Sequence, residues 1–331
     1  MSGLRLGGMS ERPAAGRMSL PAGREVVVEV PATSANLGPG FDCFGLALDW
    51  CERVTLRTEA SGFHIAVSGE GADQVPRDET HLIVRSALLG LADLGASVTG
   101  LGLDCHNTIP HGRGLGSSAA AIVAGLLAAR ALAGREPDPV WTLRHATAIE
   151  GHPDNVAAAT YGGFVLAYEG RDGVAAVEGR VSPDVAVAAF TPPHTVATKA
   201  ARALLPNRVP HVDAAANSAR AALLVEAIAG RTDLLWESTR DWLHQEYRRP
   251  AMPRSAELMT QLRGAGLAAV ISGAGPTVLV LGDAAVLADA GAAGWVPAAQ
   301  GFAVRCGAIG AGARVVSTGP EQTTSRGGCK I

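Results

Sequence analysis

A glycine-rich loop that runs directly into an apolar helix constrains this chain more than any other stretch of its 331 residues. Residues 109–121 read Ile-Pro-His-Gly-Arg-Gly-Leu-Gly-Ser-Ser-Ala-Ala-Ala, and Ala, Leu, Ile and Val continue to Leu132. Glycine takes the positive φ values that turn backbone N–H groups inward, and a helix N-terminus leaves unpaired donors beside a partial positive charge. The stretch therefore predicts a phosphate cradle followed by a buried helix over 119–132. A glycine-rich turn capped by serine is the purely structural alternative.

The two commonest nucleotide loops do not fit this stretch. A Walker-type loop needs a lysine before its hydroxyl residue, and the loop contains none. The dinucleotide pattern Gly-x-Gly-x-x-Gly also fails, because Gly112, Gly114 and Gly116 are spaced at two and two. A different class of phosphate loop is required.

The remaining pattern, Pro-x-x-x-Gly-Leu-Gly-Ser-Ser-Ala-Ala, resembles the phosphate loop of the GHMP small-molecule kinases, which include galactokinase, homoserine kinase and mevalonate kinase. The resemblance implies that ATP binds to the loop. The residues concerned are Pro110, His111, Gly112, Arg113, Gly114, Leu115, Gly116, Ser117, Ser118, Ala119 and Ala120.

A second stretch points to one branch of that superfamily. Thr-Ser-Ala-Asn-Leu-Gly-Pro-Gly-Phe-Asp, residues 33–42, resembles the first motif of homoserine kinases, whereas the opening motif of galactokinases is not found. We expect a loop here, between a strand over 25–30 that Pro31 ends and a strand over 46–58. The resemblance implies that Asn36 and Asp42 hold the substrate's amino group, a carboxylate facing an ammonium. An Asx-type turn is the structural alternative.

A third cluster, Glu-Gly-His-Pro-Asp-Asn-Val at 150–156, predicts a magnesium site. Glu150 ends an apolar helical run, where a carboxylate is unfavourable against the negative end of the helix dipole unless a cation holds it. By resemblance, Ser118 (with Ser117 as the alternative) and Glu150 hold Mg²⁺. His152, Asp154 and Asn155 match the pattern at the substrate hydroxyl. Some family members have a longer segment between the Glu and the Asn.

The later part of the chain adds residues that the resemblance assigns to the substrate. Thr198 corresponds to a residue beside the phosphoryl acceptor, and Arg202 and Arg248 to a clamp on the substrate carboxylate. Gly273 lies in Ser-Gly-Ala-Gly-Pro-Thr, residues 272–277, which resembles the third superfamily motif. An arginine on a helix is as often a solvated side chain as a ligand.

Composition excludes other classes of function. The net charge of −3 comes without a basic stripe, so neither nucleic acid nor a membrane surface is an expected partner. No run of about 18 apolar residues could span a bilayer. The five cysteines are odd in number, scattered and without a Cys-x-x-Cys pair, as is typical of reduced thiols in the cytoplasm. A homodimer is possible from the family's habit alone.

The length favours two domains, and the resemblance implies an α+β fold. We expect a disordered leader over 1–23, with Met18 an alternative start to Met1. An ATP-binding domain like ribosomal protein S5 domain 2 follows over 24–170. A ferredoxin-like domain follows over 171–316, and a flexible tail over 317–331.

Together the three resemblances imply a kinase that, like homoserine kinases, transfers the γ-phosphoryl of ATP, with Mg²⁺, to the side-chain hydroxyl of L-homoserine in threonine biosynthesis. Asn155, Glu150, Ser118 and Thr198 form the predicted catalytic set, in which Asn155 orients the acceptor hydroxyl. Two alternatives stay open: a sister kinase for another small alcohol such as mevalonate, and a regulator of the same fold that binds nucleotide without turnover.

Overall fold

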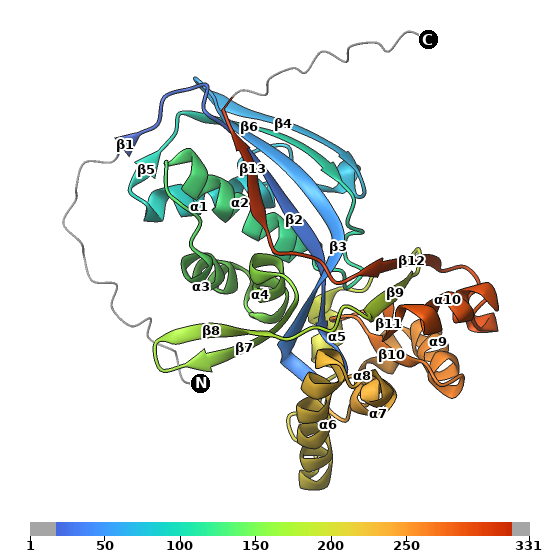
Figure 1. Cartoon of the computed structure of the whole chain (residues 1–331). Coiled ribbons are helices and arrows are strands. Elements are labelled where there is room, and N and C mark those ends of the chain that lie inside the picture. Colours follow the sequence, from blue (N-terminus) through green and yellow to red (C-terminus); the bar gives the residue numbers. More distant parts are fainter. Residues whose placement is uncertain (1–17, 320–331) are drawn as a thin grey trace, which may run out of the picture.

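Two β-sheets organise the computed structural model, which describes residues 18–319 (Figure 1). The first has seven strands in the path β13-β2-β3-β6-β4, and a β7–β8 hairpin pairs with β3. Its strands are β2 (Glu25–Asn36), β3 (Gly40–Thr58), β4 (Gly62–Gly69), β6 (Gly100–Asn107), β7 (Phe164–Gly170), β8 (Gly173–Gly179) and β13 (Arg314–Thr318). All pairs are antiparallel except β4 with β6.

Four helices cover one face of the first sheet (Figure 1). They are α1 (Leu82–Asp93), α2 (Ser117–Leu132), α3 (Pro139–Glu150) and α4 (Asp154–Tyr161). Helix α2 is buried along most of its length, as its Ala, Leu, Ile and Val content predicts, and packs on α1 and β2. It begins at Ser117, immediately after the glycine-rich loop, so the position of the helix fixes where the loop ends.

The second sheet has the order β10-β11-β9-β12, with every neighbouring pair antiparallel. Its strands are β9 (Val185–Thr191), β10 (Ala268–Ile271), β11 (Val278–Asp283) and β12 (Ala303–Ala308). The helices of this part are α5 (Thr198–Ala203), α6 (His211–Ala229), α7 (Leu235–Ser238), α8 (Gln245–Arg248), α9 (Pro253–Gly264) and α10 (Ala284–Ala292). Taken in chain order, the sheet is a βαββαβ unit with the ferredoxin-like order. The predicted α+β fold class is confirmed.

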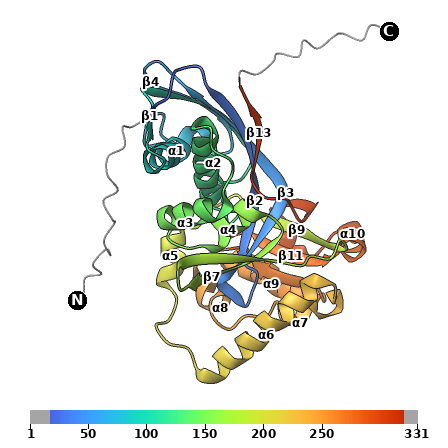
Figure 2. The ribbon, with the colours of Figure 1, turned by 60° about the vertical axis from the view of Figure 1, so that its left-hand side comes forward.

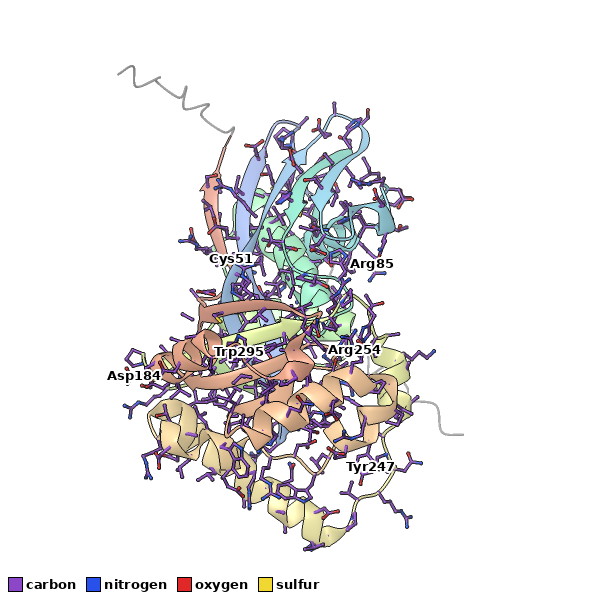
Figure 3. All side chains as sticks on the ribbon, turned by 90° about the vertical axis from the view of Figure 1, so that its right-hand side faces the viewer. Cys51, Arg85, Asp184, Tyr247, Arg254 and Trp295 are labelled. Carbon is purple, nitrogen blue, oxygen red and sulfur yellow. The ribbon has the colours of Figure 1, made fainter. Side chains whose placement is uncertain are left out.

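Both faces of the second sheet are buried, because the small apolar residues of β9 alternate between them. Val187 and Ala189 join the large core that includes α2, while Ala188 and Phe190 face a second core under α9 and α10. Trp295, labelled in Figure 3, closes that second core with its ring edge-on to Phe190 at 5.0 Å between centroids. Figure 2 shows this part of the molecule below the first sheet and its helices.

Strand β2 does not end at Pro31, so the predicted loop over 31–42 is wrong. The strand continues to Asn36 and β3 begins at Gly40, which makes the segment the tip of a long hairpin. The pairing register shifts between Pro31 and Thr33, and such an irregularity accommodates a residue that lacks an N–H group. Asn36, Leu37 and Asp42 all take positive φ at this tip.

The folded chain extends further at both ends than the sequence predicts. Strand β1 (Met18–Ser19) pairs with β5 (Ala96–Ser97), and Leu20 is buried, so the predicted leader is folded from residue 18. Strand β13 pairs with β2 through Thr318, within the predicted tail. The rest of both predicted segments, 1–17 and 320–331, lies outside the described residues. The predicted boundary after 170 falls inside the β7–β8 hairpin, and we propose that it lies between β8 and β9.

Gly125 tests the packing of α2 on α1. A Cβ atom at this position would lie 2.4 Å from the carbonyl oxygen of Ile83, a backbone atom of α1. We expect Gly125→Ala to lower the free energy of unfolding by about 1–3 kcal/mol, because overpacking outweighs the better helix propensity of alanine. Urea denaturation measures the change. The control is Gly291→Ala in α10, where the added Cβ meets the Trp295 ring at 3.6 Å. Equal stability of both variants would contradict this account.

Candidate active site

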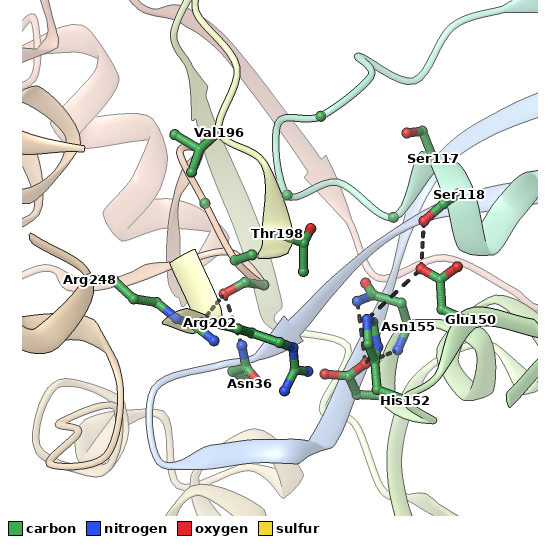
Figure 4. Close-up of a pocket in the computed structure, with 17 residues that line it drawn as sticks. Asn36, Ser117, Ser118, Glu150, His152, Asn155, Val196, Thr198, Arg202 and Arg248 are labelled. Atoms are coloured by element: carbon green, nitrogen blue, oxygen red, sulfur yellow. Dashed lines mark hydrogen bonds and ion pairs between the residues drawn. The ribbon is translucent and has the colours of Figure 1, made fainter. Parts of the chain in front are cut away.

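A polar pocket lies where the glycine-rich loop, the α3–α4 turn and the second sheet's domain meet (Figure 4). Its free volume is about 80 Å³. Its walls are Asn36, Gly112, Gly114, Gly116, Ser117, Ser118, Glu150, His152, Asp154, Asn155, Val196, Thr198, Arg202, Arg248, Gly273, Ala274 and Gly275. Residues far apart in the sequence therefore converge on one small cavity.

The glycine-rich loop has the backbone that the cradle requires. Gly112, Gly114 and Gly116 have φ values of 63°, 74° and 70°. Gly116 cannot be replaced, because a Cβ atom there would lie 1.9 Å from Oγ1 of Thr33. No side chain caps the N-terminus of α2, so its first N–H groups stay available to an anion in the pocket.

The other loop residues support this backbone from outside the pocket. Leu115, Ala119 and Ala120 are buried behind it. The guanidinium of Arg113 turns away and donates to the carbonyls of His111, Pro192 and Pro193. Pro110 and Arg113 line a separate surface cavity. Arg113 therefore ties the loop to the segment that leads into α5.

Thr33 fixes the orientation of Asn155, a role that sequence reasoning missed. Its N–H donates to the carbonyl of Leu115 at 3.0 Å, and its Oγ1 donates to Oδ1 of Asn155 at 2.8 Å. Because the hydroxyl donates to an oxygen, this contact fixes the amide oxygen of Asn155 on the Thr33 side, and the NH₂ group points away from Thr33. The only sequence signal was the place of Thr33 at the start of the first motif.

Ser118 and Glu150, predicted to share a metal, are in direct contact. Oγ of Ser118 donates to Oε1 of Glu150 at 2.5 Å (Figure 4). A hydroxyl and a carboxylate are oxygen donors of the kind that Mg²⁺ accepts alongside nucleotide phosphates and water. Within residues 18–319, no group of three His, Cys, Asp or Glu could hold a metal, so the protein alone offers only a partial ligand set.

His152 and Asp154 form a pair beside that contact. Nδ1 of His152 lies 2.8 Å from Oδ1 of Asp154, which also accepts the N–H of Asn155 at 2.7 Å. The hydrogen bond to Asp154 raises the pKa of His152 against the opposing effect of burial. Asp154 is almost fully buried and anchors the start of α4.

The opposite end of the pocket carries a buried cation. Arg248 is 1% exposed, and its guanidinium donates to the carbonyl of Gly273 at 3.1 Å and to Nδ1 of His244 at 3.3 Å. Its Nε has no partner, and no carboxylate forms an ion pair with it among the described residues. Burial lowers the pKa of Arg248, and the nearby Arg202 lowers it further. An anionic group of a ligand would suit this position.

Asn36, Asp42 and Arg202 form a connected group next to Arg248. Oδ1 of Asn36 accepts the N–H of Asp42 at 3.0 Å, and its Nδ2 donates to the carbonyl of Gly273 at 2.9 Å. Arg202 donates two hydrogen bonds to the Asp42 carboxylate, at 2.9 and 2.6 Å. Asp42 and Arg202, which the resemblance assigns to the oppositely charged amino and carboxylate groups of a substrate, thus lie against each other.

The third motif joins the hairpin tip to the glycine-rich loop. Oγ of Ser272 lies 2.8 Å from Oγ of Ser34 and donates to the carbonyl of Gly114 at 2.5 Å. The N–H of Gly273 donates to the carbonyl of Ala35 at 3.0 Å. Sequence reasoning did not single out Ser34 or Ser272, because their function is visible only when the three motifs are assembled.

A second cavity, of about 310 Å³, shares Ser117 and Ser118 with the pocket. Val75, Pro76, Leu82 and Ile83 make much of its wall apolar. His81 also lines it, at 5% exposure, and its Nδ1 has no partner. Burial lowers the pKa of His81 to about 4, so the ring is neutral at physiological pH. The cavity suits a flat heterocycle near a phosphate site.

Comparison with known proteins shows which family the chain resembles. Family models described as the GHMP kinases N-terminal domain and C-terminal domain match residues 81–163 and 220–295. Over 262 residues the chain is 55% identical to a homoserine kinase of Streptomyces coelicolor, covering 78% of this chain and 85% of that protein. It is 47% identical over 308 residues to a homoserine kinase of Mycolicibacterium smegmatis, covering 89% and 96%.

The chain belongs to the homoserine kinase family. A crystal structure of a homoserine kinase from Cytophaga hutchinsonii superposes with a TM-score of 0.75 at 27% identity, covering 94% of this chain and all of that one. Phosphomevalonate kinase from Streptococcus pneumoniae, at 17% identity and a TM-score of 0.62, shares the fold alone. In the part of the chain from 18 to 319, no helix is long and apolar enough to cross a bilayer.

Glu52 of β3 gives the site a testable pH dependence. Its buried carboxylate accepts the N–H groups of Thr108 and Ile109, directly before the loop, at 3.2 and 3.1 Å. Burial raises the pKa of Glu52 from 4.5 to about 7. Folding therefore favours the protonated form, and its contribution to stability is full below about pH 4.5 and lost as the pH rises through about 7.

We expect Glu52→Gln, which keeps an acceptor but cannot ionise, to be insensitive to this loss. Relative to the wild type, the variant should gain about 1–3 kcal/mol of unfolding free energy between pH 5 and pH 8. Urea denaturation of both proteins at the two pH values measures this difference. A difference that does not change with pH would show that Glu52 is not buried as a titrating group.

Proposed function

We propose that this protein transfers the γ-phosphoryl group of ATP to the side-chain hydroxyl of L-homoserine, giving O-phospho-L-homoserine for threonine biosynthesis. The observation that carries the proposal is the buried, unpaired guanidinium of Arg248 across a small pocket from an open phosphate cradle. A phosphate donor at one end and an acceptor with a negatively charged group at the other fit this arrangement. The relatives at 45–55% identity are named homoserine kinases.

The nucleotide occupies both cavities in this proposal. Its terminal phosphates lie on the N–H groups of the loop and of the start of α2, and its base and ribose lie in the neighbouring cavity beside His81. Ser118 and Glu150 would hold Mg²⁺, which neutralises phosphate charge when bound. In this proposal, the first motif and α5 lie on the side of the pocket that the γ-phosphate faces.

The substrate lies between the cradle and Arg248. Its carboxylate faces Arg248 and Arg202, and its ammonium faces Asp42 with the loop geometry set by Asn36. Charge-assisted hydrogen bonds of this kind fix both position and orientation. The side-chain hydroxyl then points toward Thr198, His152 and Asn155, which line the pocket beside the phosphate loop.

The residues beside the substrate hydroxyl hold it in place and do not remove its proton before the phosphoryl group is transferred. Oδ1 of Asn155 is already bonded to Thr33, so the side chain is rigid, and its amide can orient the hydroxyl. Phosphoryl transfer with a loose transition state needs positioning and charge stabilisation more than a strong base. The proton leaves late, to a phosphate oxygen or to water.

Two other functions make different demands on the site. Mevalonate has a carboxylate but no ammonium, so a mevalonate kinase of this design would leave Asp42 without a ligand. A regulator that binds nucleotide without turnover would have no need for Ser118, Glu150 and Asn155 around one point. A coupled ADP-release assay with L-homoserine, mevalonate and other small alcohols separates the three. ADP release with mevalonate but not L-homoserine would overturn the proposal.

We also propose a cytoplasmic location. A homodimer is expected from the family's habit alone. Cys43, Cys51, Cys105 and Cys306 are all free thiols in the described part of the chain, and Cys329 lies outside it. Burial raises the pKa of Cys105 to about 12, so this thiol is inert.

Arg248 and its neighbour Arg249 offer a matched pair of substitutions. Arg249, the next residue along the chain, is partly exposed and pairs with Glu246 at 2.9 Å. We expect Arg248→Ala to raise the KM for L-homoserine at least about tenfold, because a lost charge-assisted bond costs about 1.5–3 kcal/mol, and Arg249→Ala to leave it unchanged. Steady-state kinetics gives both values. Arg248→Lys serves if the alanine variant does not fold, and equal KM values in the Arg248 and Arg249 variants would remove the carboxylate assignment.

Substitutions at Ser118 and Ser117 test which of the two hydroxyls faces the metal. Because only Ser118 contacts Glu150, we expect Ser118→Ala to raise the Mg²⁺ concentration needed for half-maximal activity at least about fivefold, as loss of one oxygen ligand would. Ser117→Ala should change it little. Magnesium titration at fixed ATP measures the effect. A shift in the Ser117 variant alone would move the metal assignment to Ser117.

A further inference from the structure

The ion pair between Asp42 and Arg202 joins two groups that the proposed function assigns to opposite charges of one substrate. Arg202 donates to both oxygens of Asp42, at 2.9 and 2.6 Å. The closed pair occupies an acceptor site on each carboxylate oxygen and one N–H on each of the two terminal guanidinium nitrogens. An amino acid that bonded these same atoms would take the place of the two hydrogen bonds.

The two partners differ in how firmly they are held. Asp42 has a φ of 53°, and its N–H is bound to Asn36, whose own NH₂ is bound to Gly273. A non-glycine residue stays in the left-handed region only when its surroundings hold it there. Arg202 is a long side chain on the short helix α5, and about a third of it is exposed. Arg202 is therefore the partner that moves.

The pair also leaves the site with an uneven charge. Asp42 balances Arg202, whereas Arg248, stacked over the same Phe41 ring as Arg202, forms no ion pair with a carboxylate among the described residues. The distances from the two guanidinium carbons to the ring centroid are 5.6 and 5.3 Å. A ligand that brings only a carboxylate would balance Arg248 but would strip Asp42 of its cation if it also took Arg202.

We propose that the Asp42–Arg202 pair is exchanged for the two charges of the substrate's α-amino acid group, and that this exchange selects a zwitterion over ligands carrying either charge alone. The inference rests on the proposed function. The ligand's carboxylate takes Arg202 and Arg248, and its ammonium takes Asp42. Because both ligand charges sit on one carbon atom, they are presented side by side, as Asp42 and Arg202 are. A ligand with one charge opens the pair and leaves one partner unmatched.

This exchange makes Asp42 more than an ammonium ligand. As a ligand alone, it would not affect the binding of molecules without an ammonium. As the partner that holds Arg202 in the free protein, it weakens the binding of carboxylates that lack an ammonium. The same reasoning makes Arg202 an obstacle to amines without a carboxylate. Specificity then arises from a penalty on the wrong ligands as well as from contacts to the right one.

Two truncated forms of L-homoserine test the exchange by isothermal titration calorimetry without nucleotide. 4-Hydroxybutyrate lacks the ammonium, and 3-aminopropan-1-ol lacks the carboxylate. We expect Asp42→Asn to increase the affinity for 4-hydroxybutyrate at least about threefold, which is the scale of a partly exposed ion pair. The affinity for L-homoserine should not increase. Reciprocally, Arg202→Ala should tighten 3-aminopropan-1-ol by a similar factor.

The double variant Asp42→Asn/Arg202→Ala separates pair exchange from simple repulsion between Asp42 and a carboxylate. In the Arg202→Ala background there is no pair to open, so adding Asp42→Asn should give 4-hydroxybutyrate no further gain. A gain of equal size in that background would overturn the exchange. The control is Glu246→Gln, which breaks the exposed pair with Arg249 and removes one negative charge nearby, and should change neither affinity.

The outcomes also separate this inference from the proposed function. Wild-type protein that does not bind L-homoserine would overturn both. Wild-type protein that binds L-homoserine, with no gain for 4-hydroxybutyrate in Asp42→Asn, would overturn the exchange and leave the kinase proposal intact. A loss of affinity for every ligand in Asp42→Asn would show a structural role for Asp42 and would also overturn the exchange.

Discussion

The close contact between Gly116 and Thr33 is the constraint on which the site depends. With no Cβ at residue 116, the loop comes near enough to β2 for Thr33 to bond Leu115 with its N–H and Asn155 with its hydroxyl. One threonine thereby sets the path of the phosphate cradle and the direction of the amide beside it. Such a support, built on a strand of the sheet, holds catalytic groups more precisely than a free loop could.

The charges of the pocket are arranged on a second support. Phe41, Asn36 and Gly273 come from the hairpin tip and the third motif, and they hold Asp42 and Arg248 through backbone and ring contacts. His244 adds to this, because its Nε2 lies 2.8 Å from the carbonyl of Gly38 and its Nδ1 accepts from Arg248. Burial lowers the pKa of His244, which favours the neutral ring that such an acceptor requires. A buried cation is tolerated because neutral polar groups surround it.

Much of this arrangement is predictable from short sequence patterns, and the exceptions have physical reasons. The glycine-rich loop and α2 follow from glycine spacing and apolar content, which are local signals, whereas the ferredoxin-like order was implied by the family resemblance. The continuation of β2 past Pro31 is not predictable from local signals, because pairing with β3 and a register shift override the local effect of proline. Strand β8 and helix α4 lie in polar or short segments with weak periodicity, and only their packing against β7 and β2 makes them regular.

The site residues show the same division. Ser118 and Glu150 meet as the motifs predict, and Arg248 lies at the pocket. Thr33, Ser34 and Ser272 could not be singled out, because each acts through partners that are distant in the sequence. His81 could not be singled out either, because only the fold places it in the wall of the second cavity. The direction of Arg113, away from the pocket and onto Pro192 and Pro193, is likewise a tertiary property. Sequence patterns identify the chemistry, and contacts across the domains decide which atoms perform it.

Strand β13 has a consequence for how the chain is assembled. Because Arg314–Thr318 returns to pair with β2, the second sheet and its helices lie in the sequence between β8 and β13, two strands of the first sheet. On a ribosome, β2 is therefore made long before its outer neighbour β13. Until β13 follows, β2 presents a row of unpaired backbone groups, an edge open to other strands.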